Sequence, residues 1–263
     1  MAQDALPMNS ASTPAPATAR PLAVITGASA GIGEATARRL AREGFRLRLG
    51  ARRLPLLQRL ASELGAEARV LDVTSESSVA AFCLDIEAAE VLVNNAGGAR
   101  GLDPLAESQS PDWRWMWEVN VLGLMQMTRA LLPALERSGR GHVVNISSTA
   151  GLEVYEGGGG YTSAKHAVHA ISQTLRLELA GRPVRVTEVS PGMVETDFAR
   201  NRFGGDRERA QSVYRGAEPL SAADVADVVA FAVTRPANVN LDQIVMRPLR
   251  QAAAHKVVRR DQD

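Results

Sequence analysis

Short apolar runs alternate with longer helical stretches along most of this chain, and this alternation constrains the fold more than any other feature. Seven runs have the length and apolar character of strands; they cover 22–26, 45–50, 68–72, 91–94, 142–147, 184–190 and 243–246. Most are apolar throughout, as expected for strands buried on both faces of a parallel sheet. The run 45–50 alternates apolar and basic residues, which predicts that one of its faces is less buried.

The segments between the strands have the periodicity and end signals of helices. The stretch 33–44 ends on Gly44, a helix-stop residue, and further helices are expected over 112–138, 161–180 and 221–233. This alternation implies right-handed crossovers that place helices on both faces of one sheet. The sequence therefore predicts an α/β fold, a Rossmann-type doubly wound parallel sheet of about seven strands.

Composition shifts divide the 263-residue chain into three parts. Residues 1–20 are rich in Ala, Pro, Ser and Thr and predict a disordered N-terminal tail; a weak targeting peptide is the alternative. Residues 21–250 are expected to form a single domain, because no Pro/Gly-rich linker divides them. Residues 251–263 are expected to be a short basic C-terminal tail.

Charge and cysteine content exclude several classes of protein. No apolar run approaches the roughly 18 residues of a membrane span, and 30 basic against 29 acidic residues argue against a nucleic-acid-binding surface. The single cysteine, Cys83, excludes an intrachain disulfide and a cysteine-rich metal site, so no metal is expected. We interpret the chain as a cytoplasmic protein with neither a membrane nor a nucleic acid as partner.

A glycine-rich loop follows the first strand, where a helix begins. It reads Thr26-Gly27-Ala28-Ser29-Ala30-Gly31-Ile32-Gly33, with the spacing GxxxGxG. Glycines permit a tight turn and a close approach of the backbone to a pyrophosphate, which the N–H groups of the helix N-terminus bind. No Lys-Ser/Thr pair follows, so the loop is not a P-loop. A dinucleotide site is expected here; an ordinary strand–helix turn is the alternative.

The end of the second strand indicates which dinucleotide is preferred. Dinucleotide folds usually place an acidic residue there to bind the ribose hydroxyls, but this chain has Gly50-Ala51-Arg52-Arg53. An acidic side chain repels a 2′-phosphate, whereas guanidiniums bind one through paired hydrogen bonds. Arg52 and Arg53 therefore predict NADP(H) rather than NAD(H); two solvated arginines at a helix start are the alternative.

Tyr161 and Lys165 form a Tyr-x-x-x-Lys pair, whose members share one face of a helix. A tyrosine hydroxyl is a poor base, because its ordinary pKa is about 10. A neighbouring ammonium lowers that pKa, and a cationic nicotinamide adds to the effect. By itself the pair is more typical of a helix surface, so its meaning depends on the motifs around it.

The surrounding motifs stand in the order of one known family. They are TGASAGIG, LDVT, NNAG, VNVLG, NISSTAG, YTSAK and SPGMVETDF, and the resemblance that they carry covers about residues 21–250. In these motifs the chain strongly resembles the short-chain dehydrogenase/reductase family. The resemblance implies an oxidoreductase that orients a substrate against a nicotinamide for hydride transfer.

The resemblance also implies roles for single residues. Tyr161 would be the general acid/base, and Lys165 its activator and ribose ligand. Ser148 rather than Ser147 would bind the substrate carbonyl together with Tyr161, because the family's serine lies thirteen residues before the tyrosine. Asn120 would hold the proton-relay water. The cofactor-binding residues are expected to be Gly27, Ser29, Ala30, Gly31, Ile32, Gly33, Arg52, Arg53, Asp72, Val73, Asn94, Ala96, Gly97, Tyr161, Lys165, Pro191, Gly192, Val194 and Thr196.

The stretch 202–248 is similar to the C-terminal third of NADP-dependent 3-hydroxy acid dehydrogenases. It follows the nicotinamide loop, where the family places its substrate lid. The lid region between Phe198 and Gly216 contains five arginines and two acidic residues, so it is basic. Arg200 and Arg202 are candidates for binding a substrate carboxylate; solvated lid arginines are the alternative.

Some features depart from the family pattern. The segment 75–90 is short, which predicts a truncated helix, and the glycines at 157–160 are expected to widen or loosen the substrate pocket. Trp113, Trp115 and Trp117 cluster at the start of the helix expected at 112–138, and Trp113 and Trp117 share one face of it. This cluster favours core or subunit packing over a substrate role. The four histidines (His142, His166, His169 and His255) are given no catalytic role.

These observations favour one function and leave two alternatives. The leading hypothesis is an NADP-dependent oxidoreductase that interconverts a small 3-hydroxy acid and its 3-oxo form. The alternatives are a broad NADPH-dependent aldehyde/ketone reductase and a non-catalytic NADP(H)-binding regulator. The helices expected at 112–138 and 161–180 resemble those through which the family assembles, so a homotetramer or homodimer is expected.

Overall fold

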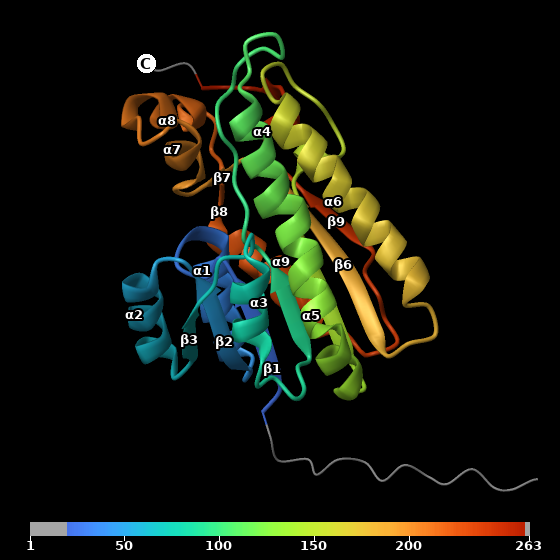
Figure 1. Ribbon diagram of the computed structural model, residues 1–263. Helices are drawn as coiled ribbons and strands as arrows, with labels where there is room; N and C mark the ends of the chain where they lie inside the picture. The colour runs from blue at the N-terminus through green and yellow to red at the C-terminus, as the bar shows by residue number, and fades with distance from the viewer. Residues whose placement is uncertain (1–19, 261–263) are drawn as a thin grey trace, which may run out of the picture.

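Seven parallel strands form the central sheet of the protein (Figure 1), whose computed structural model describes residues 20–260. Their order is β3-β2-β1-β4-β5-β6-β9. The strands are β1 (Leu22–Thr26), β2 (Arg46–Ala51), β3 (Glu67–Val70), β4 (Val91–Asn94), β5 (Gly141–Ile146), β6 (Val184–Pro191) and β9 (Gln243–Met246). The predicted Rossmann-type sheet is confirmed, and the bounds differ from the expected ones by at most two residues. The order reverses between β1 and β4, where doubly wound folds bind their ligands.

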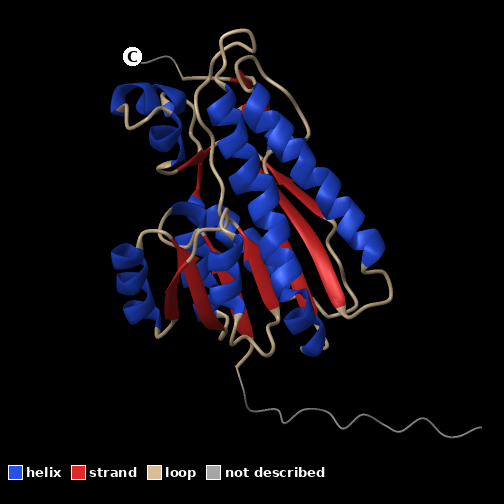
Figure 2. Ribbon diagram, viewed as in Figure 1, coloured by secondary structure: helices blue, strands red, loops and turns tan. Residues whose placement is uncertain are grey.

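Helices cover both faces of this sheet (Figures 1 and 2). One layer consists of α1 (Gly31–Arg42), α2 (Leu54–Leu64) and α9 (Ala222–Val233); the other consists of α3 (Glu76–Cys83), α5 (Gly123–Arg137) and α6 (Gly159–Glu178). Alternate residues of β1 serve the two cores: Ala23 and Ile25 pack towards α1 and α9, and Val24 packs towards α3 and α5. No helix over residues 20–260 is both long enough and apolar enough to cross a membrane.

The helix expected at 112–138 has an interruption in its middle. It begins as α4 (Ser110–Trp117), passes through a π-helical turn at Glu118–Leu122 and continues as α5. A π turn inserts an extra residue into the helical ladder and often marks a functional position. This turn contains Asn120. In the segment 75–90, where the sequence predicts a truncated helix, the structure has α3, which is eight residues long.

The prediction that one face of the second strand is less buried is wrong, because β2 is buried from Leu47 to Ala51. Arg48 lies inside with 6% of its surface exposed. It forms ion pairs with Glu67 (2.7 Å) and Asp85 (2.5 Å) and donates to the Phe82 carbonyl (3.2 Å). These partners compensate the charge, so a basic residue is tolerated on a buried face.

Short elements lie beyond the carboxyl ends of the strands. The lid contains α7 (Phe198–Arg202) and α8 (Arg207–Tyr214), and β7 (Val194–Glu195) pairs with β8 (Leu220–Ser221). Residues 251–260 lie against the domain, with β10 (Gln251–Ala253) paired to β11 (Lys256–Val257). The tail expected at 1–20 lies outside the described residues, except for Arg20.

Candidate active site

A cavity of about 1460 Å³ opens at the carboxyl edge of the sheet, beside the point where the strand order reverses. Its walls come from the glycine-rich loop, the ends of the central strands, the start of α6 and the lid helix α7. Most of the residues expected to bind cofactor or substrate line it: Gly27, Ser29, Ala30, Gly31, Ile32, Arg52, Arg53, Asp72, Val73, Ala96, Gly97, Ser148, Tyr161, Lys165, Pro191, Gly192, Val194 and Thr196.

The glycine-rich loop is closely packed against its surroundings. Gly27 has φ +65° and Gly31 has φ +56°, a region that favours glycine. A Cβ at Gly33 would lie 2.5 Å from the Gly27 carbonyl oxygen, so Gly33 supports the loop from behind rather than lining the cavity. The N-cap residue of α1, Ala30, makes no side-chain capping bond. The first N–H groups of this helix therefore face the cavity without a side-chain cap, which suits a diphosphate.

The adenosine side of the cavity is basic. Arg52 and Arg53 are exposed at its rim, and within residues 20–260 neither forms an ion pair. Arg53 Nε donates to Ser29 Oγ at 3.2 Å, which holds one guanidinium beside the phosphate loop. Burial opposes ionisation of Asp72, but hydrogen bonds from Thr74 and the charge of Arg52 lower its pKa. Two guanidiniums near a phosphate-binding loop suit a 2′-phosphate.

Three side chains, one from the loop after β5 and two from α6, lie at the other end of the cavity. Tyr161 is buried, and the Ser148 side chain is close enough to act on the pKa of its hydroxyl. Ser148 Oγ also accepts from the Ala150 N–H at 3.1 Å. Lys165 Nζ donates to the Ile146 carbonyl at 3.0 Å and lies 5.7 Å from the centroid of the Tyr161 ring. Both adjacent serines line the cavity, and Ser148 is the one whose side chain acts on the pKa of Tyr161.

Burial and local charges set the proton affinities of these groups. Burial raises the pKa of Tyr161 above its ordinary value, and the neighbouring Ser148 hydroxyl and the charge of Arg202 oppose that rise. Burial lowers the pKa of Lys165 to about 8, and the charge of Glu188 opposes this change. Ser148 and Arg202 are therefore the side chains that favour the phenolate of Tyr161. The sequence had predicted this role for Lys165.

Besides Gly33, two expected site residues lie behind the cavity wall. Asn120 Nδ2 donates to the Gly98 and Met116 carbonyls, both at 2.8 Å, and its Oδ1 accepts from the Gly98 N–H at 3.2 Å. Asn94 donates to Thr128 and Asn145, both at 2.9 Å. Neither side chain lines the cavity. Asn120 instead holds the backbone at Gly98 in place, and Gly97 and Gly98 do line the cavity.

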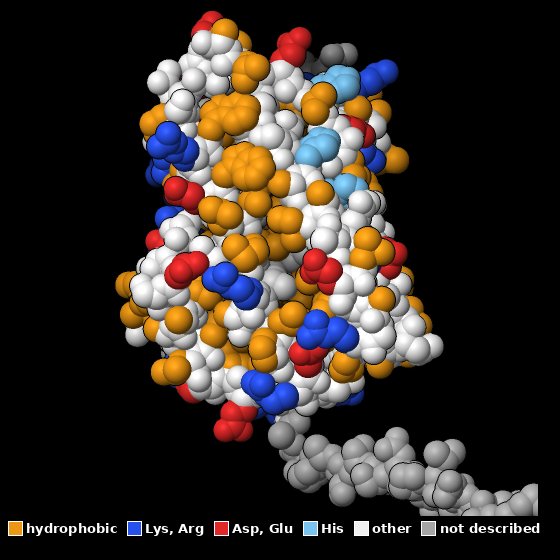
Figure 3. All heavy atoms as spheres, turned by 45° about the vertical axis from the view of Figure 1, so that its right-hand side comes forward, with side chains coloured by type: hydrophobic (Ala, Val, Ile, Leu, Met, Phe, Trp, Pro, Cys, Tyr) orange, Lys and Arg blue, Asp and Glu red, His pale blue; other side chains and the backbone are white. Residues whose placement is uncertain are grey.

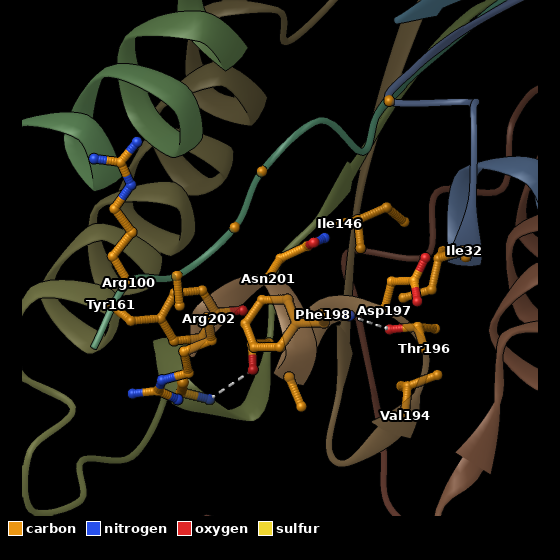
Figure 4. A pocket seen from close by; sticks show the side chains of 18 of the residues that line it. Ile32, Arg100, Ile146, Tyr161, Val194, Thr196, Asp197, Phe198, Asn201 and Arg202 are labelled. Atoms are coloured by element: carbon orange, nitrogen blue, oxygen red, sulfur yellow. Dashed lines mark hydrogen bonds between the residues drawn. The ribbon is translucent and has the colours of Figure 1, made fainter. Parts of the chain in front are cut away.

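The lid contributes Arg202 and Phe198 to the same end of the cavity as Tyr161 (Figure 4). The Phe198 ring lies 5.4 Å from the Tyr161 ring between centroids. Arg202 Nη1 donates to the Tyr155 hydroxyl at 3.0 Å, and its Nε donates to the Gly101 carbonyl at 2.7 Å. No carboxylate within residues 20–260 forms an ion pair with Arg202.

Arg200 is placed differently from Arg202. Its side chain is 44% exposed and lies 3.8 Å from the Asp197 carboxylate. Of the two arginines considered for a substrate carboxylate, the structure therefore brings Arg202 to the tyrosine and pairs Arg200 with an acid. Tyr155 and Phe198 were missed from the sequence, because no local pattern places them beside Tyr161.

The sequence suggested that the glycines at 157–160 widen or loosen the substrate pocket, but the structure shows that they permit close packing instead. A Cβ at Gly157 would lie 2.5 Å from the Leu102 carbonyl, and one at Gly160 would lie 2.4 Å from the Met116 side chain. These glycines allow the start of α6 to approach α4 and the 98–105 loop closely. Of the three tryptophans, Trp115 lines the cavity, whereas Trp113 and Trp117 do not. The Arg100 guanidinium lies 4.2 Å from the centroid of the Trp115 ring.

Comparisons with known proteins show the family and agree with the observed fold. A model of the family described as short chain dehydrogenase matches residues 21–206. An uncharacterized oxidoreductase of Mycobacterium tuberculosis is 54% identical over 239 residues, which cover 91% of this chain and 95% of that protein. An NADP-dependent 3-hydroxy acid dehydrogenase of Salmonella typhi is 39% identical over 246 residues, which cover 91% and 99%. The solved closed form of a serine dehydrogenase complexed with NADP+ has a TM-score of 0.86 and 37% identity, covering 91% of this chain and all of that one.

Proposed function

The chain belongs to the short-chain dehydrogenase/reductase family, and on that premise we propose that it is an NADP(H)-dependent oxidoreductase that interconverts a small 3-hydroxy acid and its 3-oxo form. The relatives with assigned names support the cofactor and the class of reaction. The finer assignment of substrate is supported by the side chains around Tyr161.

The residues present fit NADP(H). The glycine-rich loop and the uncapped start of α1 would hold the diphosphate, and Arg52 and Arg53 would bind the 2′-phosphate. Lys165 and Tyr161 would hold the nicotinamide ribose, as the family resemblance implies. Pro191, Gly192, Val194 and Thr196 would lie along the nicotinamide and diphosphate. The cofactor supplies or accepts the hydride when it is bound.

The chain's own residues handle the substrate oxygen and its proton. In the oxidative direction, Tyr161 takes the proton from the hydroxyl group while the C–H hydride leaves carbon 3. In the reductive direction, Tyr161 returns the proton to the oxygen. Ser148 donates a hydrogen bond to the same oxygen and stabilises its developing charge. Buried Lys165 provides a positive charge beside this group, and Asn120 holds the neighbouring wall in place.

The observation that carries the substrate assignment is the position of Arg202. Its guanidinium is aimed into the catalytic end of the cavity and has no acidic partner in the described chain. A cation in such a place is stabilised when an anionic group of the substrate completes its pairing. In a 3-hydroxy acid the carboxylate is only two carbons from the reacting carbon, so one molecule can engage both Tyr161 and Arg202.

A substrate panel tests this proposal. We expect NADP+ reduction with small 3-hydroxy acids, and NADPH oxidation with their 3-oxo forms, at higher kcat/KM than with neutral compounds of equal size. Higher values for neutral aldehydes and ketones would instead support a broad carbonyl reductase. NADPH binding without turnover of any member of the panel would support a regulator.

We also propose that the protein assembles as a homotetramer or homodimer through the α4–α6 face. Hydrophobic side chains gather on this side of the molecule (Figure 3), and Trp117, Leu122 and Leu177 are 40%, 44% and 79% exposed. Apolar patches of this kind mark subunit contacts in many proteins. Light scattering at micromolar concentration tests the proposal, and a monomer would refute it.

A further inference from the structure

Side chains at four-residue spacing connect the catalytic tyrosine with the surface along α6. Tyr161, Lys165, His169 and Gln173 follow one another at intervals of four, so they share one helix face. Tyr161 and Lys165 are buried, the His169 side chain is 24% exposed, and Gln173 is exposed. Gln173 Nε2 lies 3.0 Å from His169 Nε2. The catalytic machinery described above uses only the inner half of this row.

A buried carboxylate lies opposite this row, on β6. Glu188 has no exposed surface. Its Oε1 accepts a hydrogen bond from Ser190 Oγ at 2.8 Å, and its Oε2 lies 2.7 Å from His169 Nδ1. An ionised carboxylate without nearby positive charge is costly in such a place. Glu188 pairs in register with Asn145 of β5, the residue before Ile146, whose carbonyl accepts from Lys165.

We propose that Glu188 is a positioning residue that keeps Lys165 in its ammonium form, while His169 and Ser190 hold the Glu188 carboxylate in place. Within residues 20–260 no hydrogen bond or ion pair joins Glu188 to Lys165, so Glu188 acts through space. The interior screens charges far less than water does, and a buried carboxylate therefore stabilises a nearby ammonium strongly.

The charged and titratable groups around Lys165 support this assignment. On its own helix Lys165 faces Tyr161, and from β5 it meets only a backbone carbonyl. The lid cation, Arg202, lies 6.0 Å from the centroid of the Tyr161 ring. Among the acidic groups of residues 20–260, Glu188 is the one whose charge affects the pKa of Lys165.

The surroundings of Glu188 add no second acid to the interior. From α6 it meets His169, and from β9 it is approached by the uncharged Gln243, which lies 3.2 Å from His169 Nδ1. Asp242 stands before β9 with a 67% exposed side chain and lies 3.9 Å from Arg176. Asp242 is therefore a solvent-exposed acid beside the β6–β9 pair, and its removal can be compared with the removal of the buried Glu188.

The function of the pair follows from the charge of Lys165. Burial lowers the pKa of this lysine to about 8 even with Glu188 present. Without the negative charge, the ammonium form would be lost at a lower pH. The lysine would then be neutral under conditions in which it must hold the nicotinamide ribose.

The dissociation constant of NADPH, measured by fluorescence titration between pH 6 and pH 9, tests this inference. The readout is the ratio of the dissociation constants of Glu188→Gln and the unmodified protein at each pH. We expect a ratio near one at pH 6, where Lys165 is charged in both the variant and the unmodified protein. At pH 8 we expect NADPH binding to be about fivefold weaker in Glu188→Gln, as a downward change of about one pH unit in the titration of Lys165 would give. Glu188→Asp keeps the charge at a greater distance and should lie between the two.

Asp242→Asn is the matched control, because it removes an acid from the neighbouring strand without touching the interior. Its ratio should stay constant with pH, and a pH-dependent ratio like that of Glu188→Gln would overturn the inference. A constant ratio for Glu188→Gln would do the same. If Glu188→Gln does not fold, Glu188→Asp carries the test, and a constant ratio there contradicts the proposal.

This inference rests on the family's use of Lys165 and not on the substrate class. The NADPH titration needs no substrate, so it can fail or succeed separately from the panel that tests the proposed function. If 3-hydroxy acids prove inactive but the pH-dependent ratio is found, only the substrate assignment fails.

Discussion

The guanidinium carbon of Arg202 lies 6.0 Å from the centroid of the Tyr161 ring. This relationship joins the lid to the catalytic helix, because Arg202 also donates to the Gly101 carbonyl and to the Tyr155 hydroxyl. The same cation opposes the rise in the pKa of Tyr161 that burial causes. The lid therefore brings one positive charge to both the reacting oxygen and the place where a substrate anion would lie.

Replacing Arg202 by Ala should raise KM for a 3-hydroxy acid by about 10- to 100-fold. A hydrogen bond to a charged group contributes about 1.5–3 kcal/mol, and about 1.4 kcal/mol corresponds to tenfold in affinity. KM for a neutral ketone should change much less. Arg200→Ala is the matched comparison, because its side chain is exposed and close to Asp197. Equal effects of the two substitutions on acids and ketones would argue against Arg202 as the carboxylate-binding residue.

Tyr161→Phe should lower kcat by at least the roughly 10²–10⁴-fold attributed to general acid–base catalysis. The phenyl ring can still pack against Phe198, so the fold of the lid should persist. NADPH affinity should fall much less than kcat, because only one contact to the nicotinamide ribose is lost while Lys165, the glycine-rich loop, Arg52 and Arg53 are untouched. Steady-state kinetics and fluorescence titration provide the two measurements. A variant with more than a tenth of the original kcat would show that another group transfers the proton.

The cofactor preference should depend on Arg52. We expect NADPH to be preferred over NADH by about tenfold or more, since a tenfold difference requires only about 1.4 kcal/mol. Arg52→Asp should remove or reverse this preference through repulsion of the 2′-phosphate. Arg59→Asp makes the same charge change at an exposed position on α2 outside the cavity and should leave the preference intact. The kcat/KM values for the two cofactors decide the matter; equal values in the unmodified protein would contradict the assignment.

Lys165→Met should make the protein more stable and inactive. Burial lowers the pKa of Lys165 from 10.5 to about 8, so folding disfavours the charged lysine. This cost is fully present below pH 8 and disappears as the pH rises towards 10.5. Methionine fills a similar space without charge, and at pH 7 its gain in the free energy of unfolding should be on the order of 3 kcal/mol. Urea unfolding measures the gain. A destabilised variant would show that the Ile146 hydrogen bond outweighs the burial of charge.

His142 should make the protein sensitive to mild acid. It is buried with its Nε2 2.8 Å from Thr187 Oγ1, and burial lowers its pKa to about 3. The unfolded chain binds a proton below about pH 6.5, whereas the folded protein does not, so stability is complete above that pH and falls below it. Between pH 7 and pH 5 this loss should be about 2 kcal/mol. In urea unfolding, His142→Gln should lose that much less stability over the same range; an unchanged pH dependence would exclude His142 as its source.

The sequence determined the layers of this protein and the catalytic end of α6. The strands were predictable because each is an apolar run bounded by helical periodicity, a signal contained within a few neighbouring residues. The same holds for the glycine-rich loop, Arg52 and Arg53, and the Tyr161–Lys165 pair, whose spacing alone places both side chains on one helix face. Arg48 is the exception: its pattern indicates an exposed face, but ion pairs with Glu67 and Asp85 allow it to be buried.

The tertiary structure decided which residues meet around Tyr161. Arg202 contacts Gly101 and Tyr155 across 101 and 47 positions of sequence, and no periodicity extends over such distances. The sequence treated Arg200 and Arg202 alike, and only the folding of α7 over the cavity turns one towards the tyrosine and the other towards Asp197. In the sequence, Glu188 is only one residue of a predicted strand, with no sign of a role in the site. The packing of α6 on β6 places its charge near Lys165. Contacts of this kind depend on how elements pack against one another, and packing is a property of the whole chain rather than of any segment.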